Sequence, residues 1–144
     1  MKKTILTIED TILGRVNTSD WLELKNFNLI IAKDGISGVL LSKMLTVDLI
    51  ISEINLSKIN GFEVLKAVRK NFRTAKTPFI FLTTKTDVDS RKKAQQLGAS
   101  DYLTKPLKFS EFLQTINNQL ESSSQINQNQ QDLVKTQKSL VNLY

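Results

Sequence analysis

Five short apolar segments, separated by stretches that are each long enough for a helix, constrain the fold of this chain most strongly. The segments are rich in Ile, Leu or Phe, as strands buried on both faces of a sheet tend to be. The five predicted strands are Thr4–Ile8, Asn28–Ala32, Asp48–Glu53, Pro78–Thr83 and Asp101–Thr104. Strand–helix alternation of this kind predicts an α/β fold, with a parallel sheet, right-handed crossovers and helices on both faces.

Most of the intervening stretches carry clear helix signals. The predicted helices are Ile36–Leu45, Phe62–Asn71, Val88–Leu97 and Phe109–Leu120. The stretch between Asp10 and Phe27 is weaker, because its inward positions form a poor apolar stripe. These inward positions fall near Gly14, Asn17, Thr18 and Trp21. We expect a helix there that is short, shifted or interrupted near Asn17–Ser19.

The last part of the chain differs in composition from the rest. Half of residues 121–144 are Gln, Asn or Ser, which is typical of a flexible linker. However, Ile126, Leu133 and Leu140 repeat every seven residues and form a heptad-like stripe that continues the preceding helix. We therefore divide the chain into a domain at 1–120 and a polar tail at 121–144. The tail is either a helical, self-associating coiled coil or a frayed linker.

Composition excludes several classes of function. The chain has no cysteine and no histidine, which excludes disulfides, thiolate chemistry, His-based acid–base catalysis and a phosphohistidine carrier. It is 40% hydrophobic and 24% charged, an ordinary globular balance. Neither a signal peptide nor an apolar run long enough to span a membrane is visible. We expect a soluble, cytoplasmic protein without membrane contacts.

The net charge of +6 raises the question of a charged partner. The basic residues gather in two groups, at Lys66, Arg69, Lys70, Arg73 and Lys76, and at Lys85, Arg91, Lys92 and Lys93. Neither interleaved aromatic residues nor a groove-binding helix motif accompanies them, so we do not expect direct nucleic-acid binding. A solvated helix face accounts for most such groups, and an acidic protein partner is an equally good use of the charge.

Residues that can do chemistry stand at, or just beyond, the predicted strand ends. They are Glu9, Asp10, Glu53, Thr83 and Lys105. The carboxyl ends of parallel strands meet at one edge of a sheet, where three carboxylates would need a counter-charge. Either Mg²⁺ or Lys105 would supply that charge, and Thr83 adds a hydroxyl donor. These groups are the ones needed to position a phosphoryl group and spread its charge.

Together with Thr104-Lys105-Pro106, these residues resemble the receiver domain of two-component response regulators, over residues 4 to about 120. The resemblance implies a flavodoxin-like, chemotaxis-receiver-like fold and phosphorelay signalling of the bacterial type. It implies that Glu9, Asp10, Glu53 and the main-chain carbonyl of Asn55 surround Mg²⁺, with Asp10 a direct ligand. It further implies that Thr83 and Lys105 bind phosphoryl oxygens. Thr83 and Tyr102 match the switch residues of the family, and the aromatic one turns inward on activation.

The main departure from the family is Glu53, which stands where receivers carry the phosphoacceptor aspartate. The extra methylene moves the carboxyl by roughly 1.5 Å. Misplacement of that size can cost on the order of a hundredfold in rate. Two interpretations remain open. Glu53 either mimics the phosphorylated aspartate by reaching Thr83 and Lys105, or it forms a salt bridge with Lys105 in a retired site.

The leading hypothesis is a pseudo-receiver, a non-enzymatic signalling domain that acts through protein contacts without phosphorylation. Its Mg²⁺ site would be weak or absent if the site is retired. One alternative is a functioning Mg²⁺-dependent phosphoacceptor, and another is the N-terminal part of a larger regulator or kinase that lacks its output domain. The expected partners are a histidine kinase, an output domain or another signalling protein. A homodimer through the fifth helix and the tail is a further hypothesis.

Overall fold

Strands and helices alternate along the whole chain in this computed structural model. It describes residues 2–142, without the side chains of residues 13, 16, 17, 24, 125–130 and 138–142. The elements are β1 (Thr4–Ile8), α1 (Ile12–Leu24), β2 (Asn28–Ala32), α2 (Gly35–Met44), β3 (Leu49–Ser52), α3 (Gly61–Lys70), β4 (Phe79–Thr83), α4 (Val88–Gln96), β5 (Asp101–Thr104) and α5 (Phe109–Asn142). The sheet is five-stranded and parallel, in the order β2-β1-β3-β4-β5. The predicted flavodoxin-like α/β fold is confirmed.

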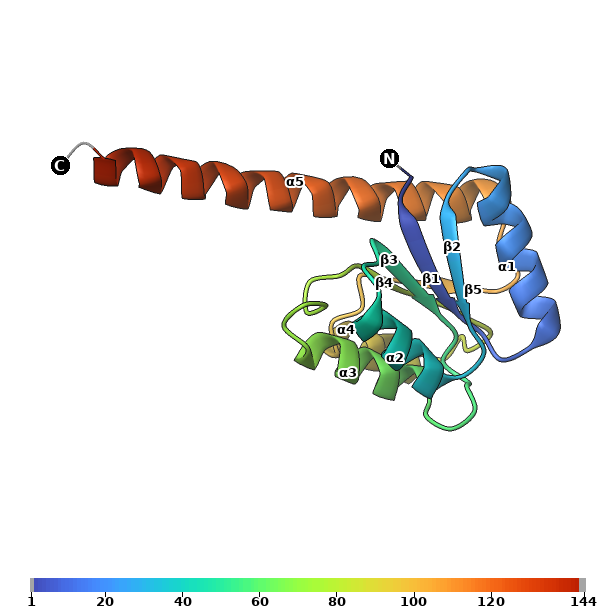
Figure 1. The fold of residues 1–144 in the computed structure, drawn as a ribbon. Helices are drawn as coiled ribbons and strands as arrows, with labels where there is room; N and C mark the ends of the chain where they lie inside the picture. The colour runs from blue at the N-terminus through green and yellow to red at the C-terminus, as the bar shows by residue number, and fades with distance from the viewer. Residues whose placement is uncertain (1, 143–144) are drawn as a thin grey trace.

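Helices cover both faces of the sheet, with α1 and α5 on one face and α2, α3 and α4 on the other (Figure 1). Successive strand residues enter opposite cores. Ile5 packs toward α1 and α5 whereas Leu6 packs toward the other helices, and both are fully buried. Because both faces are covered, the central strands β3 and β4 are buried at every residue and each is apolar except for its last residue.

The first helix is continuous, so the expected interruption near Asn17–Ser19 is wrong. Thr11 caps α1 by accepting a hydrogen bond from the Gly14 main-chain N–H at 3.2 Å. The ring of Trp21 lies 5.6 Å and 5.4 Å from two phenylalanine rings of α5, and the neighbouring Leu22 is buried. These contacts anchor the helix to the domain despite its weak apolar stripe.

The other element boundaries coincide with the predicted ones or differ from them by one residue, apart from the end of α5. The caps of α2, α3 and α4 are Asp34, Asn60 and Asp87, and each accepts a hydrogen bond from the main-chain N–H three residues on. Gly98, with φ of +97°, follows α4 in the left-handed conformation expected of a helix stop. The strand β3 ends at Ser52, so Glu53 begins the loop and does not end the strand.

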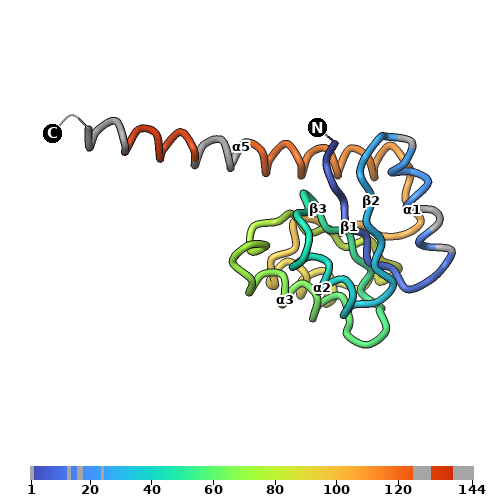
Figure 2. The backbone as a smooth tube through the Cα atoms, in the orientation of Figure 1, coloured from blue at the N-terminus to red at the C-terminus, as the bar shows by residue number. Residues whose placement is uncertain are grey.

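The last helix continues far beyond the sheet, which agrees with the helical alternative for the tail (Figures 1 and 2). Leu120 is the last core residue of α5 among the side chains that the structure describes, and residues 131–137 are exposed. Of the heptad positions, Leu133 is exposed, whereas the side chains of Ile126 and Leu140 lie outside the described residues. In the part of the chain that the structure describes, no helix combines the length and apolar character needed to cross a membrane.

Candidate functional site

The sheet brings the predicted site residues to one edge. Residue pairing places the end of β1 beside the end of β3, with Ile8 opposite Ser52, so Glu9 and Glu53 leave the sheet side by side. Likewise Thr83 pairs with Thr104, the residue before Lys105. Glu9 and Glu53 are only 7% and 6% exposed, and Thr83 is fully buried. Charged groups buried to this extent need partners close by.

Glu53 uses both carboxylate oxygens. Its Oε1 accepts hydrogen bonds from the Thr83 hydroxyl and from the Ile54 main-chain N–H at 2.8 Å, with a longer one from Asn55 N–H at 3.4 Å. Its Oε2 lies 3.3 Å from the ammonium of Lys105. A single side chain therefore contacts both groups that, by resemblance, would bind phosphoryl oxygens.

Lys105 lies between two buried carboxylates. Its Nζ donates to Glu9 Oε2 at 3.0 Å and faces Glu53 Oε2 on its other side. Burial disfavours the charged ammonium, but the hydrogen bonds and charges of Glu9 and Glu53 outweigh it and raise the pKa of Lys105 above its ordinary value. The lysine is consequently a fixed positive charge at neutral pH.

Glu9 is held from the α1 side by residues that the sequence did not single out. Its Oε1 accepts from the Thr11 hydroxyl at 2.7 Å and from the Thr11 N–H at 3.2 Å. Arg15 donates to the main-chain carbonyls of Glu9 and Asp10, at 3.2 and 3.0 Å. A side chain at Gly14 would meet the Glu9 carboxylate, since a Cβ there would lie 2.7 Å from Glu9 Cδ. The sequence did contain one signal for the contact between Thr11 and Glu9. Thr11 stands two residues after Glu9 at the start of a predicted helix, where a threonine commonly acts as the N-cap.

The arrangement of carboxylates does not fit the Mg²⁺ ion that the family implies. Asp10 turns toward the loop after β3, where its Oδ2 accepts from Ser57 N–H at 3.1 Å. Among the described residues, no three acidic side chains converge on one metal position. The ammonium of Lys105 also occupies the space between Glu9 and Glu53, where a second cation would be repelled. Lys105 is therefore the counter-charge that Glu9 and Glu53 share at this edge.

A chain of hydrogen bonds connects Glu53 to Tyr102. Thr83 Oγ1, which donates to Glu53, also accepts from Lys85 N–H at 3.2 Å, and the Tyr102 hydroxyl donates to Lys85 O at 2.8 Å. Tyr102 is buried, and burial together with the charge of Asp87 raises the pKa of its hydroxyl, which stays a donor. Its ring packs 6.1 Å from Phe81. The aromatic side chain thus points inward.

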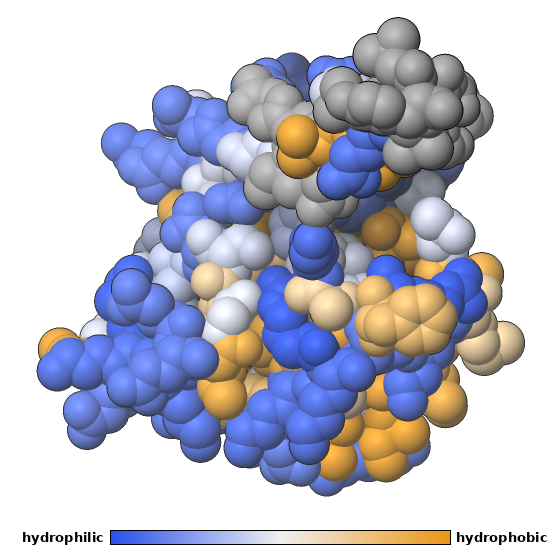
Figure 3. All heavy atoms as spheres, turned by 90° about the vertical axis from the view of Figure 1, so that its left-hand side faces the viewer, coloured by the Kyte–Doolittle hydropathy of each residue, from blue (hydrophilic) through white to orange (hydrophobic). Residues whose placement is uncertain are grey.

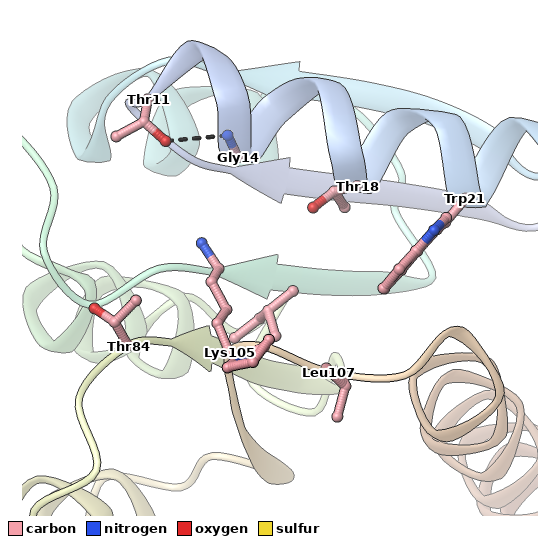
Figure 4. A pocket seen from close by; sticks show the side chains of 9 residues that line it. Thr11, Gly14, Thr18, Trp21, Thr84, Lys105 and Leu107 are labelled. Carbon is pink, nitrogen blue, oxygen red and sulfur yellow. Dashed lines mark hydrogen bonds between the residues drawn. The ribbon is translucent and has the colours of Figure 1, made fainter.

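A half-open cavity of about 530 Å³ lies next to Lys105, between α1 and the connection from β5 to α5 (Figure 4). Its lining residues are Thr11, Gly14, Thr18, Trp21, Leu82, Thr84, Lys105, Pro106 and Leu107. The cavity exists because the inward positions of α1 carry small side chains at Gly14 and Thr18. Trp21 borders the same space as Lys105, so the chain's single tryptophan lies close enough to report on the site.

Comparisons with known proteins match most of the chain. The family model for the response regulator receiver domain matches residues 5–117. The chain is 35% identical over 118 residues to a probable transcriptional regulator, ycf29, of Pyropia yezoensis, covering 82% of this chain. It spans 53%, about half, of that regulator's length.

Other similar proteins are matched over most of their length. A probable chemotaxis protein CheY of Rhizobium etli is 37% identical over 106 residues, which are 73% of this chain and 82% of that protein. The structure of the Vibrio cholerae chemotaxis protein CheY4 superposes with a TM-score of 0.78 at 29% identity, covering 82% of this chain and 98% of the other. The likeness therefore extends through sequence and fold.

Proposed function

Because the chain belongs to the response regulator receiver domain family, we propose that it is a two-component signalling module that Glu53 biases toward its active form without phosphorylation. The module is not an enzyme in this proposal and acts by binding other proteins. Glu53 takes the place of the phosphorylated aspartate, and its carboxylate makes the contacts that a phosphoryl group would make.

The hydrogen bond from Thr83 to Glu53 carries this proposal. A retired site needs only the salt bridge between Glu53 and Lys105, which both interpretations share. The Thr83 hydroxyl also donates to this carboxylate. This second contact favours the interpretation that Glu53 mimics a phosphorylated aspartate, because Thr83 then binds a negative charge at the acceptor position. The inward position of Tyr102, connected to Thr83 through Lys85, supports the same interpretation.

The magnitude of the contact limits how strongly Glu53 acts. A hydrogen bond to a charged group contributes about 1.5–3 kcal/mol. Moving a two-state equilibrium from 1:99 to 99:1 takes about 5.5 kcal/mol. Glu53 carries one negative charge where a phosphoryl group carries nearly two. It therefore biases the switch toward the active form and leaves room for a partner to complete the shift.

Incubation with acetyl phosphate and Mg²⁺, followed by intact-mass measurement, tests the proposal. The wild-type chain is expected to gain no base-labile phosphate, because its carboxyl is displaced and already engaged. The Glu53→Asp variant serves as the matched control, since it restores the family's acceptor and is expected to gain one phosphate. A base-labile phosphate on Glu53 of the wild-type chain would overturn the proposal.

A functioning phosphoacceptor is the second candidate. It is favoured by the presence of Glu9, Asp10, Thr83 and Lys105 around the acceptor position. It requires Lys105 to leave the space between Glu9 and Glu53 so that a divalent cation can enter. Titration with Mg²⁺ while following Trp21 fluorescence separates the two candidates, because a saturable response at millimolar Mg²⁺ is expected only of the phosphoacceptor.

The proposed partner surface is formed by α4, β5 and α5 around Arg91 and Tyr102, whereas the ring of Phe109, also expected there, packs against Trp21 of α1. Arg91 lies 4.6 Å from the Tyr102 ring centre and donates to the Tyr102 carbonyl at 3.4 Å, so the inward tyrosine shapes this surface. A histidine kinase, an output domain or another signalling protein would bind there. The greater length of the transcriptional-regulator relatives favours a regulator in which residues 1–120 form the receiver and 121–144 lead toward an output region.

A further inference from the structure

The second helix turns three large apolar side chains to solvent, whereas its fully buried residues are small. Its fully buried residues are Gly35, Gly38 and Ser42. Its outer row is Ile36, Leu40 and Met44, which are 44%, 51% and 74% exposed. These three follow one another at a spacing of four and form a single ridge, here called the α2 ridge. A helix that is apolar all round is usually buried on every side.

The small residues explain how α2 can lie so close to the sheet. A Cβ at Gly38 would lie 2.5 Å from Ile8 Cδ1, and one at Gly35 would lie 2.3 Å from the Ile59 carbonyl oxygen. Only glycine is compatible with these approaches. Core packing thus accounts for the inner face of α2, to which Val39 and Leu41 also contribute, and it leaves large parts of the α2 ridge side chains exposed.

Cations and a further aromatic side chain border the α2 ridge. Lys43 lies on the same side of the helix, and Arg73 reaches it from the loop after α3 through a hydrogen bond to the Lys43 carbonyl at 3.5 Å. Phe72, next to Arg73, is 91% exposed. Figure 3 shows apolar side chains gathered on the right-hand side of that view, where α2 lies, with hydrophilic side chains around them. Neither cation forms an ion pair with another side chain that the structure describes.

We propose that the α2 ridge is a docking site for an acidic amphipathic helix of another protein. A ridge at a spacing of four fits the groove of a second helix, and its apolar side chains would be buried there. Acidic residues flanking the partner's apolar stripe would meet Lys43 and Arg73. A second copy of this chain is the poorer occupant, because it would bring the same cations against each other.

This surface lies on the opposite face of the sheet from α1 and α5 and does not involve Glu53. The proposal therefore goes beyond the function proposed above and stands or falls separately from it. Since the ridge and its cations are exposed, they can be changed with little effect on the core.

A pair of designed peptides tests the site. The acidic probe is a fluorescein-labelled helix of about 18 residues with leucines on one face and glutamates on the others. The basic probe has lysine in place of every glutamate. The acidic probe is expected to bind the full chain with micromolar affinity and to shift the NMR signals of α2, Phe72 and Arg73. The basic probe is expected to bind at least about tenfold more weakly. Equal binding of the two probes, or binding of neither, would overturn the proposal.

Variants of the full chain distinguish specific binding at the α2 ridge from non-specific hydrophobic binding. Leu40→Asp is expected to weaken binding of the acidic probe about tenfold or more. Ile12→Asp is the matched control, because Ile12 is 73% exposed on α1 and lies on the other face of the sheet. The double variant Lys43→Glu with Arg73→Glu is expected to reverse the preference between the probes, which a folding defect would not do. An Ile12→Asp effect equal to that of Leu40→Asp contradicts the assignment.

An anionic lipid surface is the competing occupant, and the same variants test it. Sedimentation with phosphatidylserine vesicles is expected to leave the wild-type chain in solution, since one ridge offers little area for insertion. Binding to vesicles that Leu40→Asp abolishes and Ile12→Asp preserves would replace the protein partner with a membrane and overturn the proposal.

Discussion

The carboxylate of Glu53 accepts a hydrogen bond from the hydroxyl of Thr83, a residue 30 positions further along the chain and on the neighbouring strand. The same carboxylate faces Lys105 at 3.3 Å. One side chain therefore joins the ends of β3, β4 and β5. This arrangement makes the extra methylene of glutamate useful, because it carries the carboxyl toward groups that would otherwise bind a phosphoryl oxygen.

Replacing Glu53 with glutamine should weaken the site without changing its shape. Glu53→Gln keeps an oxygen that can accept from Thr83 but removes the charge that strengthens this bond and pairs with Lys105. We expect a loss of about 1 kcal/mol in the free energy of unfolding, the difference between charged and neutral hydrogen bonds. Urea unfolding followed by Trp21 fluorescence measures it. Unchanged stability would mean that the charge of Glu53 contributes nothing to the fold.

Removing the Thr83 hydroxyl should uncouple Tyr102 from Glu53. Thr83→Val keeps the side-chain volume but deletes both the donor to Glu53 and the acceptor of Lys85 N–H. We expect a loss of about 1–3 kcal/mol in stability and faster amide hydrogen exchange at Lys85. The neighbouring Thr84 is exposed, so Thr84→Val is the control and should change neither quantity. A double-mutant cycle with Glu53→Gln should give a coupling of at least about 0.5 kcal/mol.

The pairing of Lys105 should appear as a pH dependence of stability. Lys105→Met leaves Glu9 and Glu53 facing each other, and we expect a loss of about 1–3 kcal/mol at pH 7, since the lysine is partly exposed. Because folding raises the pKa of Lys105, its contribution is complete below the ordinary lysine value of 10.5 and is lost as the pH rises through the higher folded-state pKa. The stability difference between wild type and variant should therefore stay constant from pH 7 to 10 and shrink above it. A difference that grows above that range contradicts the assignment.

Gly61 should be required for the position of Glu53. A Cβ at Gly61 would lie 2.3 Å from the Glu53 carbonyl oxygen and 2.8 Å from Ile54 Cα, so both obstacles are main-chain atoms. Alanine at a helix start gains up to about 1 kcal/mol over glycine. We expect the clash to exceed this gain and Gly61→Ala to lower stability by about 1–3 kcal/mol. The NMR signals of Glu53 and Thr83 should shift as well, and their constancy would contradict the close approach.

The extension of α5 beyond Leu120 should matter for association and not for the fold. Because Leu120 is the last core residue among its described side chains, a chain of residues 1–120 should keep the thermal midpoint of the full chain. A long helix without packing is marginal in water, so we expect the full chain to pair through the tail. Light scattering should then give the full chain a molar mass about twice that of a single chain, and the chain of residues 1–120 the mass of a monomer. The same oligomeric state for the full chain and for residues 1–120 would contradict a coiled-coil dimer formed by the tail.

The strands and their connections could be predicted because their signals are local. A strand buried on both faces is apolar along its length, and capping residues such as Asp34 and Asp87 mark helix starts directly. The meeting of the site residues at one edge followed from the parallel arrangement alone. In contrast, the continuity of α1 depends on Trp21 packing against α5, a contact that no local pattern contains.

The residue pattern alone predicts the parallel sheet, the order of its elements and the edge at which Glu9, Glu53, Thr83 and Lys105 gather, because strand burial and strand direction follow from that pattern. The partners of these groups are established by packing between elements. Whether Glu53 reaches Thr83, whether Lys105 stands between two carboxylates, and which face of α2 turns outward all depend on distances between side chains from different elements. Those distances are set by packing, which depends on several segments of the chain at once and therefore cannot be predicted from any one of them.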